Sequence, residues 1–142
     1  MDKIVILIII VVVSAGAIFW AVQSGIFSGP APLIPVPEGA LLFFGQNCPH
    51  CKIVEDFIIA NNIDQKVKFS RLEIPFNGKT SPQLESNAKL LIQLAQGCKI
   101  DVSKGVSIPF LYDPSAGSGQ AGKCLVGQDD VINFFKNAAD IK

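Results

Sequence analysis

The longest apolar run of the chain covers residues 4–22, where 19 consecutive positions carry no charged side chain. A helix of that length spans about 28 Å, which is close to the hydrocarbon thickness of a bilayer. Trp20 stands near the end of the run, where an aromatic ring suits the membrane–water interface. The pattern predicts a transmembrane signal anchor over residues 1–22.

Two other interpretations of this run stay open. The tripeptide Ala15-Gly16-Ala17 has the small–x–small pattern of a cleavage site, which would make the run a removable signal peptide. A buried core helix is the other alternative. Lys3 precedes the run and no Lys or Arg follows it until Lys52, so the positive-inside rule predicts a cytoplasmic N-terminus and an extracytoplasmic remainder.

A proline-rich stretch follows the apolar run, with four prolines between residues 30 and 37. Proline fixes φ and lacks a backbone N–H, so this spacing disfavours helix and favours the extended polyproline conformation. We therefore expect a Pro-rich linker over residues 23–38 that acts as a semi-rigid spacer.

From residue 39 to residue 142 the apolar pattern changes its period several times, as in an α/β domain. Residues 40–45 are apolar throughout, which is typical of a central strand covered on both faces. Ser81 and Pro82 favour the start of a helix, and Gly97 suits its C-cap. The predicted elements are a strand at 40–45, a helix at 49–60, a strand at 67–74, a helix at 82–96, an antiparallel pair of strands at 108–112 and 124–126, and a helix at 129–139.

The charges of the chain balance, with 12 basic and 12 acidic residues. This balance gives no sign of an electrostatic nucleic-acid surface, because such surfaces concentrate positive charge to neutralise phosphates. The apolar residues make up 49% of the chain, and their excess lies in the N-terminal run. Length and composition together fit one modest domain with an apolar appendage.

The chemistry of the chain concentrates in Cys48-Pro49-His50-Cys51, which places two thiols around the only histidine. At the start of a helix this spacing sets both sulfurs on one face, within reach of a disulfide. The helix N-terminus and a neighbouring imidazolium favour the thiolate. We expect thiol–disulfide exchange, with Cys48 as the more exposed, reacting sulfur, Cys51 as the resolving thiol, and His50 stabilising the Cys48 thiolate.

The order of elements and this motif resemble the thioredoxin-fold superfamily over residues 39–142. The domain is similar to small glutaredoxin- or thioredoxin-like domains, and its Cys-Pro-His-Cys sequence is most similar to that of the DsbA-type extracytoplasmic thiol oxidases. Gly127, before the last helix, resembles part of the glycine region of glutaredoxins. The resemblance implies an α/β fold, a thioredoxin-like β-α-β-α-β-β-α domain after one N-terminal transmembrane helix.

Further site residues follow from this resemblance. Ile108-Pro109 matches the family's cis-proline beside the thiols, and the Ile108 backbone would pair with an extended substrate segment. Pro49 and Gly127 would also lie in the substrate-binding region. For Pro109 the alternative is an ordinary trans proline at the start of an edge strand.

Two further cysteines, Cys98 and Cys124, bring the total to four. In an oxidising compartment an even count favours a second, structural disulfide. Two independent buried thiols and a second redox relay are the alternatives. A structural zinc site shared with Cys48 and Cys51 is disfavoured, because Cys98 and Cys124 are not paired at ligand spacing, and we expect no bound metal.

Two other segments carry weaker signals. Residues 117–124 nearly match the phosphate-binding pattern G-x-x-x-x-G-K-[ST], but Cys124 replaces the hydroxyl residue and no helix is expected next. A flexible glycine-rich hairpin loop is the better interpretation. Asp129 and Asp130 are expected to cap the last helix, with a glutathione contact as the alternative.

We expect a membrane-anchored protein disulfide oxidoreductase that exchanges a Cys48–Cys51 disulfide with extracytoplasmic protein thiols. It needs no cofactor beyond this cysteine pair, and a membrane redox partner is expected. The alternatives are a zinc- or copper-binding thioredoxin-like module and a glutathione-dependent glutaredoxin that faces the cytoplasm. The sequence leaves the direction of electron flow open.

Overall fold

The computed structural model describes residues 39–116 and 122–141, which belong to the compact unit Pro37–Lys142. The predicted anchor, the predicted linker and most of the glycine-rich loop lie outside these residues. Within the described ranges, no helix combines the length and the apolar character that a membrane span requires.

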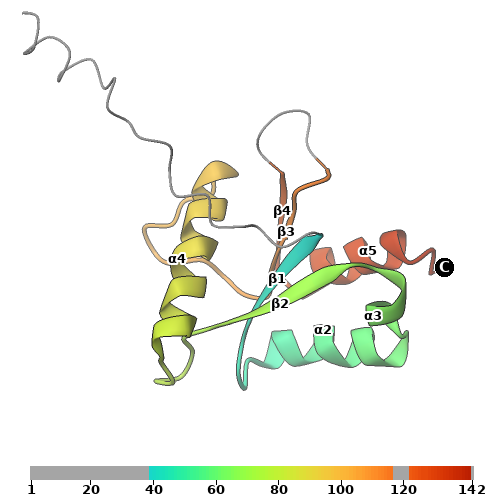
Figure 1. Ribbon diagram of the computed structural model, residues 1–142, viewed down its shortest axis with the longest axis horizontal. Helices are drawn as coiled ribbons and strands as arrows, with labels where there is room; N and C mark the ends of the chain where they lie inside the picture. Colours follow the sequence, from blue (N-terminus) through green and yellow to red (C-terminus); the bar gives the residue numbers. More distant parts are fainter. Residues whose placement is uncertain (1–38, 117–121, 142) are drawn as a thin grey trace, which may run out of the picture. The chain divides into compact units, whose positions relative to one another are not determined.

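A four-stranded mixed sheet lies at the centre of the described domain (Figure 1). Its strands are β1 (Ala40–Gly45), β2 (Phe69–Ile74), β3 (Phe110–Asp113) and β4 (Lys123–Val126), in the order β2-β1-β3-β4. β1 runs parallel to β2 and antiparallel to β3, and β3 pairs antiparallel with β4. The predicted central strand at 40–45 is confirmed, because β1 has a neighbour on each side and is almost entirely buried.

Helices cover both faces of the sheet (Figure 1). They are α2 (Pro49–Ala60), α3 (Ile63–Lys66), α4 (Pro82–Gly97) and α5 (Gln128–Ala138). α2, α3 and α5 pack their apolar side chains on one face, against Leu42 and Leu111. α4 covers the other face, where Leu91 and Ala95 join a separate cluster with Phe43. The mixed α/β class predicted from the sequence is confirmed.

The second strand begins at Phe69, two residues later than predicted. Its apolar alternation breaks in the sequence at Arg71-Leu72, yet the backbone remains a regular strand paired with β1 through Ile74. The Arg71 guanidinium lies 4.8 Å from the centre of the Phe69 ring, and so shares the face covered by α2 and α3. Leu72 faces the α4 side. The break in the pattern is therefore a cation placed on a half-buried face rather than a change of register.

Several helix ends differ from the sequence prediction. Gly97 is the last residue of α4, and Cys98 is the C-cap. α5 begins after Gly127, whose φ is +94°, and no side chain caps this helix. The predicted capping by Asp129 and Asp130 is therefore wrong, although both acids lie in the first turn, where the helix dipole favours them. The sequence pattern does not predict the short helix α3.

Candidate functional site

Cys48 lies at the junction of β1 and α2, just beyond the C-terminal end of the strand β1. A tight turn makes this junction: Asn47 has φ +62°, and the Cys48 N–H donates to the Gly45 carbonyl at 3.3 Å. Pro49 occupies the first turn of α2, where a missing N–H leaves no intrahelical bond unmade. The four-residue motif therefore opens the first helix, as predicted.

The sulfur of Cys48 caps α2. Its Sγ accepts the backbone N–H of Cys51 at 3.3 Å, in the position that a serine or aspartate oxygen takes at many helix starts. The N–H groups of the first turn and the positive end of the helix dipole point toward this atom. This placement stabilises negative charge on the Cys48 sulfur, which is the charge that a thiol nucleophile carries.

Cys51 lies one turn further along α2. Cys48 and Cys51 are 4% and 7% exposed, so the expectation that Cys48 is the more exposed of the two is wrong. The capping bond explains this, because it holds the Cys48 sulfur back against the helix. Burial, together with the hydrogen bond to Cys48, raises the pKa of the Cys51 thiol to about 12. Cys51 therefore stays protonated at neutral pH, where it is a poor nucleophile.

The Ile108–Pro109 peptide bond is cis, as the resemblance implies, and the trans alternative is wrong. Pro109 is buried and lines the same groove as Cys48 and Cys51. Its carbonyl accepts the N–H of Gly127 at 2.8 Å, which joins the start of β3 to the start of α5. The Ile108 side chain packs into the cluster under α4. Within the described residues, Ile108 and Gly127 thus hold Pro109 in place and do not themselves line the groove.

The groove has a volume of about 800 Å³ and extends from the two thiols along α2. Pro49 and Pro109 stand beside the thiols. The apolar part of its lining is made by Leu42, Phe44, Val54 and Ile59. Ile59 is 63% exposed, so the groove ends at an apolar side chain open to solvent. Such a surface accommodates an apolar segment of another molecule next to Cys48.

The charged side chains of the groove are paired with one another or with close neighbours. Lys52 Nζ lies 2.9 Å from an Asp56 carboxylate oxygen. Arg71 Nε lies 3.2 Å from Glu55, and Arg71 Nη1 lies 2.6 Å from Asp64. The bond to Asp64, with a further contribution from Glu55, holds the pKa of Arg71 above its ordinary value. Arg71 is not among the site residues predicted from the sequence, although it is the single arginine of the chain and lies in a half-apolar strand.

His50 is exposed on the first turn of α2 and bonds to α5. Its Nδ1 lies 2.8 Å from Oε1 of Gln128. Because an amide oxygen can only accept, Nδ1 carries a hydrogen and donates it. This bond joins the first turns of two helices beside the thiols. No pattern in the sequence predicts a site role for Gln128, since a glutamine at a helix start is not distinctive. The action of His50 on the Cys48 thiolate stays a prediction.

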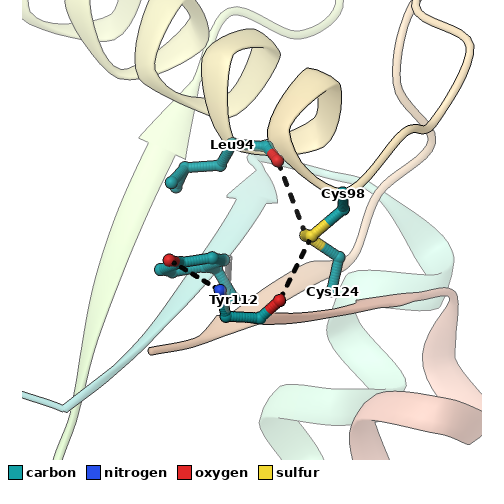
Figure 2. The surroundings of a disulfide bond; sticks show 5 residues. Leu94, Cys98, Tyr112 and Cys124 are labelled. Atoms are coloured by element: carbon teal, nitrogen blue, oxygen red, sulfur yellow. Dashed lines mark hydrogen bonds between the residues drawn. A yellow bond between two sulfur atoms is a disulfide. The ribbon is translucent and has the colours of Figure 1, made fainter. Parts of the chain in front are cut away.

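Cys98 and Cys124 form a disulfide that joins the end of α4 to β4 (Figure 2). Their Cα atoms lie 6.1 Å apart. A disulfide is thus confirmed among the alternatives open from the sequence, and two independent thiols are excluded. Two sulfurs bonded to each other cannot serve as thiolate ligands in a zinc site shared with Cys48 and Cys51. The described ranges also contain no cluster of three or more metal-binding side chains.

Comparisons with known proteins return no match: no protein-family model, no curated protein and no solved structure is similar to this chain. Function must therefore be inferred from the site itself. The site combines a helix-capping thiol, a second buried thiol one turn away and a cis-proline on the wall of the same groove. Two thiols at this spacing can release two electrons by forming a disulfide and take them up again when it is reduced.

Proposed function

We propose that the domain has a thioredoxin-like fold and acts as a protein thiol–disulfide oxidoreductase through Cys48 and Cys51. The observation that carries the proposal is the position of the Cys48 sulfur, which caps α2 in a groove shared with Cys51 and Pro109. The element order agrees with such a fold once α3 is counted as an addition after α2. The proposal also agrees with the sheet order, in which β1 is central and delivers the motif at its end.

In the oxidising direction, a substrate thiolate attacks the Cys48 sulfur of the Cys48–Cys51 disulfide, and the Cys51 sulfur leaves and takes up a proton. A second substrate thiolate then attacks the substrate sulfur of this mixed disulfide. The substrate disulfide is released, and Cys48 leaves as the thiolate that the helix N-terminus stabilises. Two electrons pass from the substrate to the cysteine pair. The reducing direction is the same sequence of steps in reverse.

The groove favours protein segments over glutathione as substrate. Glutathione carries two carboxylates, and a site for it needs cations that are free to bind them. Among the described residues, the cations that line the groove are Lys52 and Arg71, and both are already paired with acidic side chains. The apolar lining instead offers contact to an extended segment rich in apolar side chains. We therefore propose cysteine-containing protein segments as the substrate class.

We further propose that residues 1–22 anchor the domain to a membrane with the domain on the extracytoplasmic side. The support is the charge-free run at 4–22 and the single Lys3 before it. Each turnover leaves the cysteine pair in the opposite redox state, so a membrane thiol oxidase or reductase is the expected partner.

A membrane-impermeant thiol reagent added to intact cells should label Cys48. Labelling that requires lysis would contradict this topology.

A chromogenic peptide tests the proposed chemistry. The substrate is a short apolar peptide whose cysteine is joined to thionitrobenzoate, so that attack on the peptide sulfur releases one coloured thiolate. The full-length Cys51→Ala variant should release one equivalent and retain the peptide on Cys48, because the resolving thiol is absent. Cys48→Ala, the matched control, should react at least about a hundredfold more slowly, because Cys51 is protonated at neutral pH.

The same assay distinguishes the substrate classes. Thionitrobenzoate joined to glutathione should react more slowly with Cys51→Ala than the apolar peptide does. Equal or faster reaction with glutathione would favour the glutaredoxin alternative. Equal rates for Cys48→Ala and Cys51→Ala would overturn the assignment of Cys48 as the exchanging sulfur.

A further inference from the structure

The Cys98–Cys124 disulfide lies at a second hollow, apart from the groove at Cys48. This hollow has a volume of about 360 Å³. It is lined by Gly97, Cys98, Lys99, Ile100, Gly122 and Cys124. Both cysteines are only partly buried, and two of the other lining residues are glycines, so no large side chain stands over the sulfurs from those positions. The positive charge of Lys99 favours the approach of a thiolate.

Two carbonyl oxygens face the sulfur atoms (Figure 2). The Cys124 sulfur lies 3.6 Å from the Leu94 carbonyl oxygen, and the Cys98 sulfur lies 3.6 Å from the Gly122 carbonyl oxygen. A disulfide has no hydrogen to donate, whereas each of two thiols can donate one S–H. Both acceptors are therefore in place for the reduced pair.

The disulfide also closes a covalent ring that contains Pro109. The two cysteines are 26 positions apart, and the ring includes residues 99–108, which form no helix or strand. Four partly buried aliphatic side chains hold this segment against the cluster under α4. They are Ile100, Val102, Val106 and Ile108. The disulfide fixes the start of the segment, and Pro109 stands at its end.

We propose that Cys98–Cys124 is a second thiol–disulfide exchange site, which small thiols reduce in the folded protein, and that its redox state controls the order of residues 99–108. One small-molecule thiolate attacks a sulfur of the pair and forms a mixed disulfide, and the other cysteine leaves and is protonated. A second thiol then releases the small-molecule disulfide and the second cysteine. Two thiols thus supply two electrons and two protons. The proposal does not depend on the function proposed for Cys48.

Reduction kinetics of the full-length protein test the exchange step. Cys48→Ala/Cys51→Ala removes the other pair, and glutathione or dithiothreitol serves as the thiol, with alkylation and peptide mass spectrometry as the readout. Exchange in the folded protein predicts a rate that rises in proportion to thiol concentration and is unchanged by low urea. A rate that saturates with thiol and rises steeply with urea would mean that reduction requires unfolding. That result would overturn the proposal.

A pair of variants at Gly97 tests whether small thiols reach the Cys98–Cys124 disulfide through the hollow. Among the described residues, a Cβ at Gly97 would meet no atom within 4 Å apart from its chain neighbours and its own helix backbone, so alanine fits there. Gly97→Leu should slow reduction about tenfold, because exchange depends on access to the attacked sulfur. Gly97→Ala gives a similar gain in helix propensity with one methyl group and should stay within about twofold of the parent. Equal rates for both variants would overturn the assigned route.

Hydrogen exchange tests the control of residues 99–108. In the same Cys48→Ala/Cys51→Ala background, reduction of Cys98–Cys124 should accelerate amide exchange in residues 99–108 by about tenfold or more. Amides of α2, which the disulfide does not touch, serve as the internal control and should change much less. Equal protection of residues 99–108 in both redox states would refute control of this segment.

Discussion

Removing the Cys98–Cys124 disulfide should lower the free energy of unfolding by about 3.5 kcal/mol at 25 °C. The bond joins residues 26 positions apart. A cross-link over a loop of that size removes about 12 cal/mol/K of entropy from the unfolded chain. For a domain of about 100 residues, the corresponding fall in melting temperature is about 15 °C.

Serine at both positions isolates this loop-closure effect. A serine hydroxyl at position 98 or 124 can still donate to the Gly122 or Leu94 carbonyl, which the sulfurs now face at 3.6 Å. The double serine variant therefore lacks the cross-link of the parent protein but keeps a hydrogen-bond donor for each of the two carbonyl groups. Because the open chain exposes more surface when unfolded, the dependence of stability on urea should also become steeper.

The assay is urea unfolding of the full-length protein in a non-ionic detergent, followed by circular dichroism. Cys48→Ala/Cys51→Ala serves as the parent, so that only one cysteine pair can change its redox state. Chemical reduction of this parent should reproduce the loss caused by the double serine variant. A loss below about 1 kcal/mol by both routes would refute the reasoning, because the loop entropy alone exceeds it.

Three further perturbations test the site. Because the pKa of Cys51 is raised above 9.0 on folding, its contribution to stability is complete below pH 9 and declines as the pH rises toward 12. The urea midpoint of the reduced protein should therefore fall over this range relative to Cys51→Ala, and parallel profiles would contradict the burial of this thiol. Gly45→Ala should cost about 1–3 kcal/mol in unfolding free energy, because a Cβ there would lie 2.7 Å from the Phe76 Cβ, and an unchanged urea midpoint would contradict that packing. His50→Ala should slow the alkylation of Cys48 at neutral pH, and an unchanged rate would remove His50 from the mechanism.

Elements with strong local signals are the ones that the sequence predicts well. The boundaries of β1 and α2 agree with prediction, since an apolar strand, a turn and a proline-led helix follow one another without a gap. Ser81 accepts the Leu84 N–H at 3.3 Å and so caps α4 as expected. The position of Cys48 is a local property of this kind. It follows from the residues on either side of it.

Features that depend on contacts between distant residues are not readable in the same way. The bond from His50 to Gln128 arises only when α2 and α5 are packed together. The pairing of Cys98 with Cys124 depends on where α4 ends relative to β4, which no local pattern reports. The requirement for glycine at position 45 also depends on a distant residue, because Phe76 leaves no room for a Cβ there.

A glutathione redox titration of the full-length protein tests the central claim most directly, with the state of each cysteine pair followed by peptide mass spectrometry. The claim predicts that Cys48 and Cys51 convert together in one two-electron step to an intramolecular disulfide. The midpoint should lie between the potentials of thioredoxin and DsbA, about −270 and about −120 mV, and its position in that range would indicate the direction of electron flow. Cys48 and Cys51 that stay thiols across the range, or form separate glutathione adducts, would contradict the claim.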